Sequence, residues 1–198
     1  MFKPFANVFV LIILLASFSI LVIRRWRINI ITLAVQYLAV FLLITMSWPA
    51  SLAVIKLIVG WMLCAVLGIT CLSLKNMDND SDRELFASYF FRGIAGLLIT
   101  VVVISLVPST QAILPESVSV QIIRGSLVLI SMGLLQLGMT TKPLYVIIGL
   151  LTFISGFELL YSALEVSTLL EGLLAGINLG LALVGAYFLV MQEQAESA

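Results

Sequence analysis

The chain has no histidine and only two cysteines among its 198 residues. Cys64 and Cys71 lie seven residues apart in one apolar run, about 10 Å along a helix, which is too far for a disulfide between them. A haem or metal site needs ligands that this composition does not supply, so we expect no cofactor. Because no nucleophile and base stand out as a pair, we also expect that the chain is not itself an enzyme.

Charged residues are scarce as well. Ten basic and ten acidic residues make up 10% of the chain and leave no net charge. Without a basic patch, nucleic acid is not expected as a partner. Hydrophobic residues make up 62%, which is more than a soluble domain of this length can bury. The sequence therefore predicts an integral membrane protein in contact with the lipid bilayer.

The apolar runs are continuous, whereas the strands of a membrane barrel alternate between polar and apolar residues. Lipid cannot satisfy backbone polar groups, so such runs cross the bilayer as helices of about 20 residues. The predicted fold is therefore all-α, a polytopic transmembrane helix bundle of about seven spans. The predicted spans are residues 6–23, 28–48, 51–74, 93–107, 118–137, 144–164 and 168–191.

The longest polar stretch, residues 75–92, is predicted to be a solvated loop whose aromatic end lies at the membrane interface. It divides the chain into an N-terminal three-helix membrane segment with this loop (1–92) and a C-terminal four-helix membrane segment (93–198). Pro108 is expected to end the fourth span, because proline cannot continue a helix. Residues 192–198 are expected to form a polar tail.

Basic residues outside the spans favour one side of the membrane. Lys3 falls on one side, whereas the other side has Arg24, Arg25, Arg27, Lys75, Arg83, Arg92 and Lys142. Because cytoplasmic loops are enriched in Lys and Arg, this bias predicts an external N-terminus and a cytoplasmic C-terminus.

Four charged residues, Lys56, Arg124, Glu158 and Glu171, interrupt the apolar runs. A charge in hydrocarbon costs at least a few kcal/mol, so such residues are functional candidates by default. The predicted topology places all four at similar depth in the outer half of the membrane. Two cations and two carboxylates in one layer could neutralise one another, which would make their burial tolerable.

These charges lie on stripes of polar or small residues at helical spacing, a pattern that marks helix–helix contact in membranes. The clearest stripes are Ala53, Lys56, Gly60 and Cys64; Gln121, Arg124 and Ser131; Ser155, Glu158 and Ser162; and Glu171, Ala175, Asn178 and Ala182. An uncharged stripe of Asn29, Thr32 and Gln36 adds to them in the second span.

Simpler roles remain open for three of the four charges. Lys56 and Arg124 can extend their side chains to the membrane interface. Glu171 can be an acid that the dipole at a helix N-terminus favours. Glu158 has a short side chain between Phe157 and Leu159, so it is salt-bridged, protonated, or part of a proton or ion path.

The last three spans carry a pattern of glycine and apolar residues: GSLVLISMGLLQLG (125–138), YVIIGLL (145–151) and LGLAL (179–183), with Lys142 in a short turn. This pattern resembles the three-helix K subunit of complex I and the C subunit of Mrp-type cation/proton antiporters. The E component of group-4 membrane hydrogenases is a longer form with extra N-terminal helices, and the segment AVIKLIV (53–59) resembles a lysine-bearing helix of that group. The resemblance covers about residues 120–190, and more weakly 20–75.

Members of that family carry a membrane glutamate on each of two helices, in a lateral proton path. The matching positions here are Leu151 and the neighbourhood of Gly176, and neither is acidic. Glu158 lies seven residues beyond Leu151 on the same face, whereas Glu171 lies five residues before Gly176 on a different face. The resemblance therefore implies either carboxylates that have moved outward or a scaffold that has lost pumping.

The leading hypothesis is an accessory membrane subunit of a complex I-like, Mrp-like or membrane-hydrogenase-like assembly, in a bacterial inner membrane. It would dock beside larger antiporter-like subunits and support proton or cation translocation. Glu158 and Glu171 would handle protons, Asn178 would line the path, and Lys56 and Arg124 would set the pKa of the carboxyl groups. Two alternatives stay open: an independent small transporter, which predicts an internal repeat or broken helices, and a purely structural scaffold.

Overall fold

A computed structural model describes residues 6–74, 86–116, 118–165 and 167–197. Seven helices, and no strand, form within these ranges. They are α1 (Ala6–Val22), α2 (Trp26–Ile44), α3 (Ala50–Ser73), α4 (Phe86–Ile113), α5 (Val120–Gly138), α6 (Pro143–Ser162) and α7 (Thr168–Ser197). The prediction of an all-α polytopic bundle is confirmed, since α2 to α7 are long and apolar enough to cross a membrane and α1 is a shorter apolar helix.

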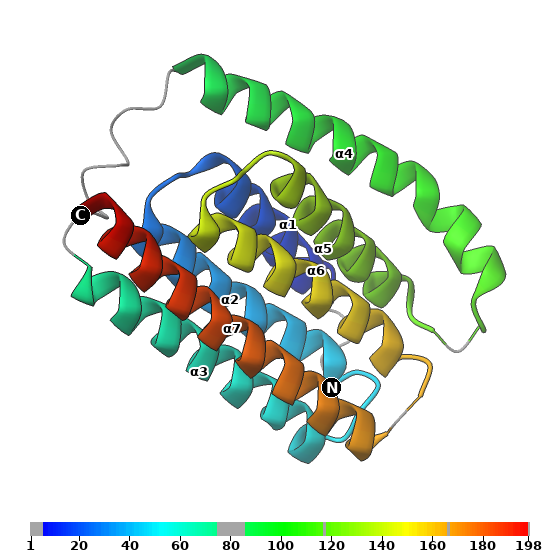
Figure 1. Ribbon diagram of the computed structural model, residues 1–198. Coiled ribbons are helices and arrows are strands. Elements are labelled where there is room, and N and C mark those ends of the chain that lie inside the picture. The colour runs from blue at the N-terminus through cyan, green and yellow to red at the C-terminus, as the bar shows by residue number, and fades with distance from the viewer. Residues whose placement is uncertain (1–5, 75–85, 117, 166, 198) are drawn as a thin grey trace.

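The helices run back and forth along one bundle axis (Figure 1). The α2 helix contacts α1, α3 and α6, and α5 packs against α1, α4 and α6. The α7 helix covers α3 and α6, whereas α4 lies along the outside of the bundle against α5 and α1. Helices from the segments 1–92 and 93–198 therefore pack directly against one another, α1 on α5 and α3 on α7.

The expectation that Pro108 ends the fourth span is wrong, because α4 continues through Pro108 to Ile113. Proline lacks an N–H, so only the bond to one carbonyl in the preceding turn is lost. Neighbouring hydroxyl groups add bonds inside the same helix: Ser105 donates to the Val101 carbonyl and Thr110 to the Leu106 carbonyl. A proline within a membrane helix is tolerated under these conditions.

Two further boundaries differ from the prediction. Residues 86–92, which were expected to belong to the polar loop, form the start of α4, and the boundary at residue 92 falls inside this helix. The expected polar tail continues α7 as far as Ser197. Both segments lack proline. Residues 192–197 are mainly Gln, Glu and Ala, which are good helix formers, and residues 86–92 include Ala and Arg, so neither segment interrupts the helix that it extends. The rest of the loop, residues 75–85, lies outside the described residues.

Glycines bring α5 and α6 close together. A Cβ atom added to Gly133 would lie 2.6 Å from the Phe153 nitrogen and 2.8 Å from the Gly149 oxygen. A Cβ added to Gly156 would lie 2.7 Å from Leu129 Cβ. Small residues allow such close backbone approach between membrane helices, and here they fix α6 at the centre of the bundle.

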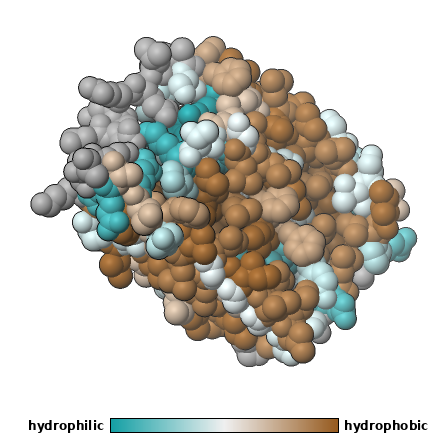
Figure 2. Space-filling model, viewed as in Figure 1, coloured by the Kyte–Doolittle hydropathy of each residue, from teal (hydrophilic) through white to brown (hydrophobic). Residues whose placement is uncertain are grey.

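Large apolar side chains cover the outside of the bundle. On α4, Leu97, Leu98 and Ile104 are exposed, and on α7, Leu169 and Leu183 are exposed. Figure 2 shows an apolar surface along most of the helices on the face in view. Exposed apolar area of this extent indicates contact with lipid or with other membrane helices.

Candidate functional site

Lys56 of α3 and Glu158 of α6 form a salt bridge inside the bundle. Their side chains are only 3% and 2% exposed. Lys56 lies in the second turn of α3 and Glu158 one turn before the end of α6, so both lie towards the same end of the bundle. Each ion offsets part of the cost of burying the other, which explains how two charges persist in an apolar bundle.

Asn178 of α7 joins this pair. Its Nδ2 group donates a hydrogen bond of 2.7 Å to Glu158 Oε1, while the other carboxylate oxygen, Oε2, meets the Lys56 ammonium group. Asn178 is fully buried. Both oxygens of the Glu158 carboxylate therefore have a partner, and three helices meet at this side chain.

Glu171 and Tyr37 complete the cluster. Glu171 is buried on α7, seven residues before Asn178, and its charge interacts with that of Lys56. The Tyr37 ring of α2 covers the ammonium group from another side, with Lys56 Nζ 5.6 Å from the ring centroid, within the range of a cation–π interaction. The absence of a side chain at Gly60 makes room for this ring, because a Cβ atom there would overlap it.

The structure brings together four of the five candidate residues, Lys56, Glu158, Glu171 and Asn178, but not Arg124. Arg124 lies in the second turn of α5 with its side chain exposed. Within the described part of the chain, no ion pair joins it to either carboxylate of the cluster. Its position near a helix end suits a side chain that extends to the membrane interface. The buried cluster therefore has one cation and two carboxylates.

The two positions that match the membrane glutamates of the resembled family are not acidic in this chain. Leu151 is fully buried within an apolar group of side chains from α1, α2, α3, α6 and α7. Gly176 lies on an exposed face of α7. Neither position contributes to the cluster, and both acidic residues in it lie closer to the helix ends than these positions do.

A second buried polar group lies towards the other end of the bundle. Arg24, in the turn between α1 and α2, donates to Thr140 Oγ1 at 2.9 Å, and its guanidinium lies 4.3 Å from the centroid of the Tyr145 ring. The Tyr145 hydroxyl in turn donates to the Arg24 carbonyl at 2.7 Å, and Gln136 Nε2 donates to the Tyr145 carbonyl at 2.9 Å. These contacts tie the α1–α2 turn to the α5–α6 turn.

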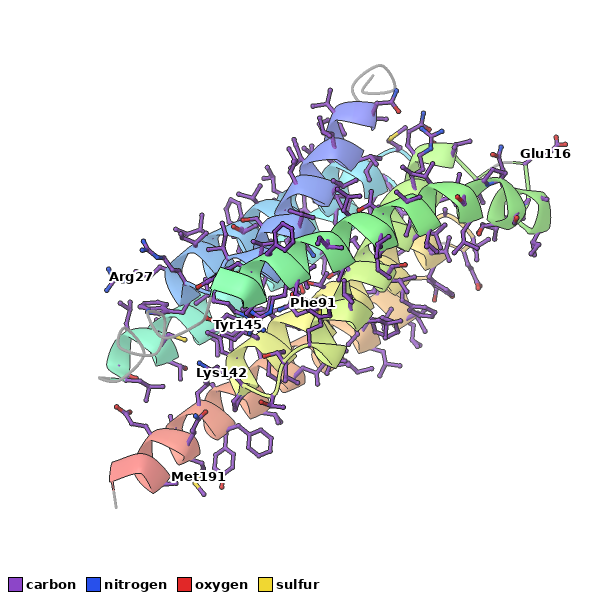
Figure 3. All side chains as sticks on the ribbon, turned by 90° about the horizontal axis from the view of Figure 1, so that it is seen from above. Arg27, Phe91, Glu116, Lys142, Tyr145 and Met191 are labelled. Carbon is purple, nitrogen blue, oxygen red and sulfur yellow. The ribbon has the colours of Figure 1, made fainter. Side chains whose placement is uncertain are left out.

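Sequence reasoning used Arg24 only as a signal of membrane orientation. Its partner Tyr145 lies 121 residues away, and no spacing in the sequence connects the two. Figure 3 places Arg27 and Lys142 at this end of the bundle and Glu116 at the opposite end. The basic residues of the α1–α2 and α5–α6 turns thus share one end, as the predicted topology requires.

Within the described ranges, no group of three Cys, Asp or Glu side chains is placed to hold a metal ion. Comparisons with protein-family models, with curated proteins and with solved structures found no match. The fold and the cluster together define a polytopic membrane protein with a buried ionic site.

Proposed function

We propose that this protein supports proton or monovalent cation translocation across the membrane, as an accessory subunit of a complex I-like, Mrp-like or membrane-hydrogenase-like assembly. The observation that carries the proposal is the buried cluster in which Lys56 pairs with Glu158, with the buried Glu171 close enough to influence the same ammonium group electrostatically. Ionisable residues inside membrane segments usually mark proton or ion paths.

The charge balance of the cluster suits such a role. One ammonium group cannot neutralise two carboxylates, and a net charge is costly inside the bundle. The cluster becomes neutral when it takes up one proton or one monovalent cation. Because Lys56 pairs with Glu158 and lies within electrostatic range of Glu171, the proton can occupy either carboxylate while the charge of the lysine offsets that of the other. A site that alternates between these two states can accept a proton on one side and release it on another.

Two observations support the assembly with larger subunits. The pattern of glycine and apolar residues in α5 to α7 resembles that of small subunits in such complexes. In addition, the outer faces of α4 and α7 carry rows of exposed apolar side chains along their length, which can contact lipid or neighbouring subunits.

Purification of the tagged chain from its native membrane in mild detergent, followed by mass spectrometry, tests the association with larger subunits. Antiporter-like or hydrogenase-like subunits in a stable ratio are expected.

An independent transporter is the second candidate. It is favoured by the fact that α2, α3, α6 and α7 of one chain supply every group of the cluster. A chain that purifies alone, or only with copies of itself, would favour this candidate over the accessory subunit.

The transport claim is tested by proton flux into proteoliposomes that contain the complex, or the chain if it purifies alone. Glu158→Gln is expected to reduce the flux at least tenfold, and Arg124→Gln to leave it unchanged. If Glu158→Gln does not fold, the triple variant Lys56→Gln/Glu158→Gln/Glu171→Gln removes all three charges of the cluster and leaves no unpaired ion there. Wild-type flux in a folded Glu158 variant would instead indicate a structural scaffold.

A further inference from the structure

Several buried polar side chains lack a hydrogen-bond partner within the described part of the protein. They include both amide groups of α2, whose oxygen and nitrogen atoms are all unpartnered, and several hydroxyl groups. The atoms concerned are Nδ2 and Oδ1 of Asn29, Nε2 and Oε1 of Gln36, and the hydroxyl groups of Ser17 and Thr152; the hydroxyl groups of Tyr37 and Ser155 lie beside each other and have no further partner. All of these residues are at most 2% exposed.

Five of these side chains, all except that of Ser17, lie along the contact between α2 and α6. The two helices run in the same direction and touch each other. Their register is fixed at two points: the Tyr145 hydroxyl bonds to the Arg24 carbonyl at one end, and Ser155 lies beside the Tyr37 hydroxyl further along. Asn29 and Gln36 of α2, and Thr152 of α6, fall between these points or next to them.

Helical periodicity places these residues on the facing sides. Asn29 and Gln36 are seven residues apart on α2, which is two turns, so their side chains point the same way. Thr152 is seven residues beyond Tyr145 and three before Ser155, so it shares a face with both. Glu158 follows Ser155 by three residues and begins the ionic cluster. The polar side chains thus form a row that leads from the Arg24–Tyr145 contact to Lys56 and Glu158.

Buried polar atoms without partners are costly, and native structures satisfy them with protein groups or with bound water. A row that served only for packing would be filled at lower cost by apolar residues. We propose that Asn29, Gln36, Thr152 and Ser155 line an internal file of water molecules between α2 and α6. The file runs about 20 Å, the length of the 13 residues from Tyr145 to Glu158. The role of this file rests on the proposed function, since a proton that leaves the cluster needs such a route.

Arg24 lies at the end of the file away from the cluster. Arg24 precedes Asn29 by five residues in the sequence. Its guanidinium lies over the Tyr145 ring and bonds to Thr140 of the α5–α6 turn. A proton can pass along hydrogen-bonded water and polar side chains of this kind.

The test measures the access of water-borne silver ions to single thiols in the intact protein. In a background without Cys64 and Cys71 (Cys64→Ala, Cys71→Ala), Gln36→Cys and Ser155→Cys place thiols in the row. Ala39→Cys, buried among apolar side chains of the same α2 helix, is the matched control, and Ile31→Cys faces outward on that helix. After silver exposure, the protein is denatured and the remaining free thiols are labelled with a maleimide.

Silver is expected to protect the thiols at positions 36 and 155 at least ten times faster than those at positions 39 and 31. Arg27→Cys at the helix end serves as the fully accessible reference. Equal and slow protection at all four positions, with rapid reaction of Arg27→Cys, would overturn the water file. The assay does not depend on transport, so the two claims can fail separately. Accessible thiols without proton flux would contradict the proposed function and support the water file. Proton flux without accessible thiols would support the proposed function and contradict the water file.

Discussion

Asn178 donates a hydrogen bond of 2.7 Å to Glu158, twenty residues earlier in the chain, and so holds the carboxylate that pairs with Lys56. The bond crosses from α7 to α6, and the salt bridge crosses from α6 to α3. The Glu158 side chain therefore links three helices in the interior of the bundle. The geometry of the cluster depends on the packing of these helices, and the packing depends in turn on the cluster.

Asn178→Leu should lower both stability and transport. It leaves Glu158 Oε1 without its donor, and loss of a hydrogen bond to a charged buried group costs about 1.5–3 kcal/mol. Thermal unfolding in detergent and proton flux in proteoliposomes measure the two effects. Ile177→Ala, at the neighbouring exposed position, should change neither by a comparable amount. Equal unfolding temperatures for Asn178→Leu and wild type would show that the bond does not stabilise the fold.

Lys56→Met should be more damaging than the loss of the whole ion pair. The single change leaves the Glu158 carboxylate buried without its cation, at a cost of about 3–5 kcal/mol, whereas Lys56→Met/Glu158→Leu removes that carboxylate as well and leaves only Glu171 without a cation. The double variant should therefore unfold at a higher temperature than Lys56→Met. Additive losses in this double-mutant cycle would contradict a direct interaction.

Arg124→Met is the matched control for that cycle. Arg124 is exposed and outside the cluster, so its replacement should leave the unfolding temperature within a few degrees of wild type. A loss as large as that of Lys56→Met would mean that Arg124 takes part in the ionic interactions after all.

Gly133→Ala should destabilise the contact between α5 and α6. The nearest atoms to an added Cβ are backbone atoms of α6, which cannot move aside without shifting the helix. Overpacking of this kind costs about 1–3 kcal/mol. Gly172→Ala, where an added Cβ meets nothing within 4 Å, should be neutral. Unfolding of the two variants, measured side by side, checks this difference.

The sequence was sufficient to predict the membrane helices, because continuous apolar runs have few other solutions. It also indicated that Lys56, Glu158 and Glu171 lie at similar depth, since depth follows from counting residues along each span. Counting does not give rotation about the helix axis. One residue corresponds to 100° of rotation, so Arg124 turns outward while its neighbour Gly125 packs against Leu43 and Leu159.

Helix ends and distant contacts were harder to predict. Pro108 and the polar tail suggested earlier ends for α4 and α7, but both helices continue beyond those ends. The Arg24–Tyr145 contact could not be foreseen, because it depends on how two turns meet at one end of the folded bundle.

We expect Tyr145→Phe to lower the free energy of unfolding by about 0.5–1.5 kcal/mol, the contribution of the hydrogen bond from its hydroxyl group to the Arg24 carbonyl. Tyr187→Phe, at an exposed position, should have no effect. Unfolding of both variants in detergent measures the difference, and identical unfolding curves would contradict it.

The central claim is that the buried cluster takes up and releases one proton shared by Glu158 and Glu171. Infrared difference spectroscopy between acidic and alkaline buffers detects a protonated carboxyl group directly. We predict a carboxyl band that shifts in deuterated water and is lost or displaced in Glu158→Gln and in Glu171→Gln, but is retained in Glu165→Gln, whose side chain is exposed. An identical difference spectrum in wild type and in both cluster variants would contradict the claim.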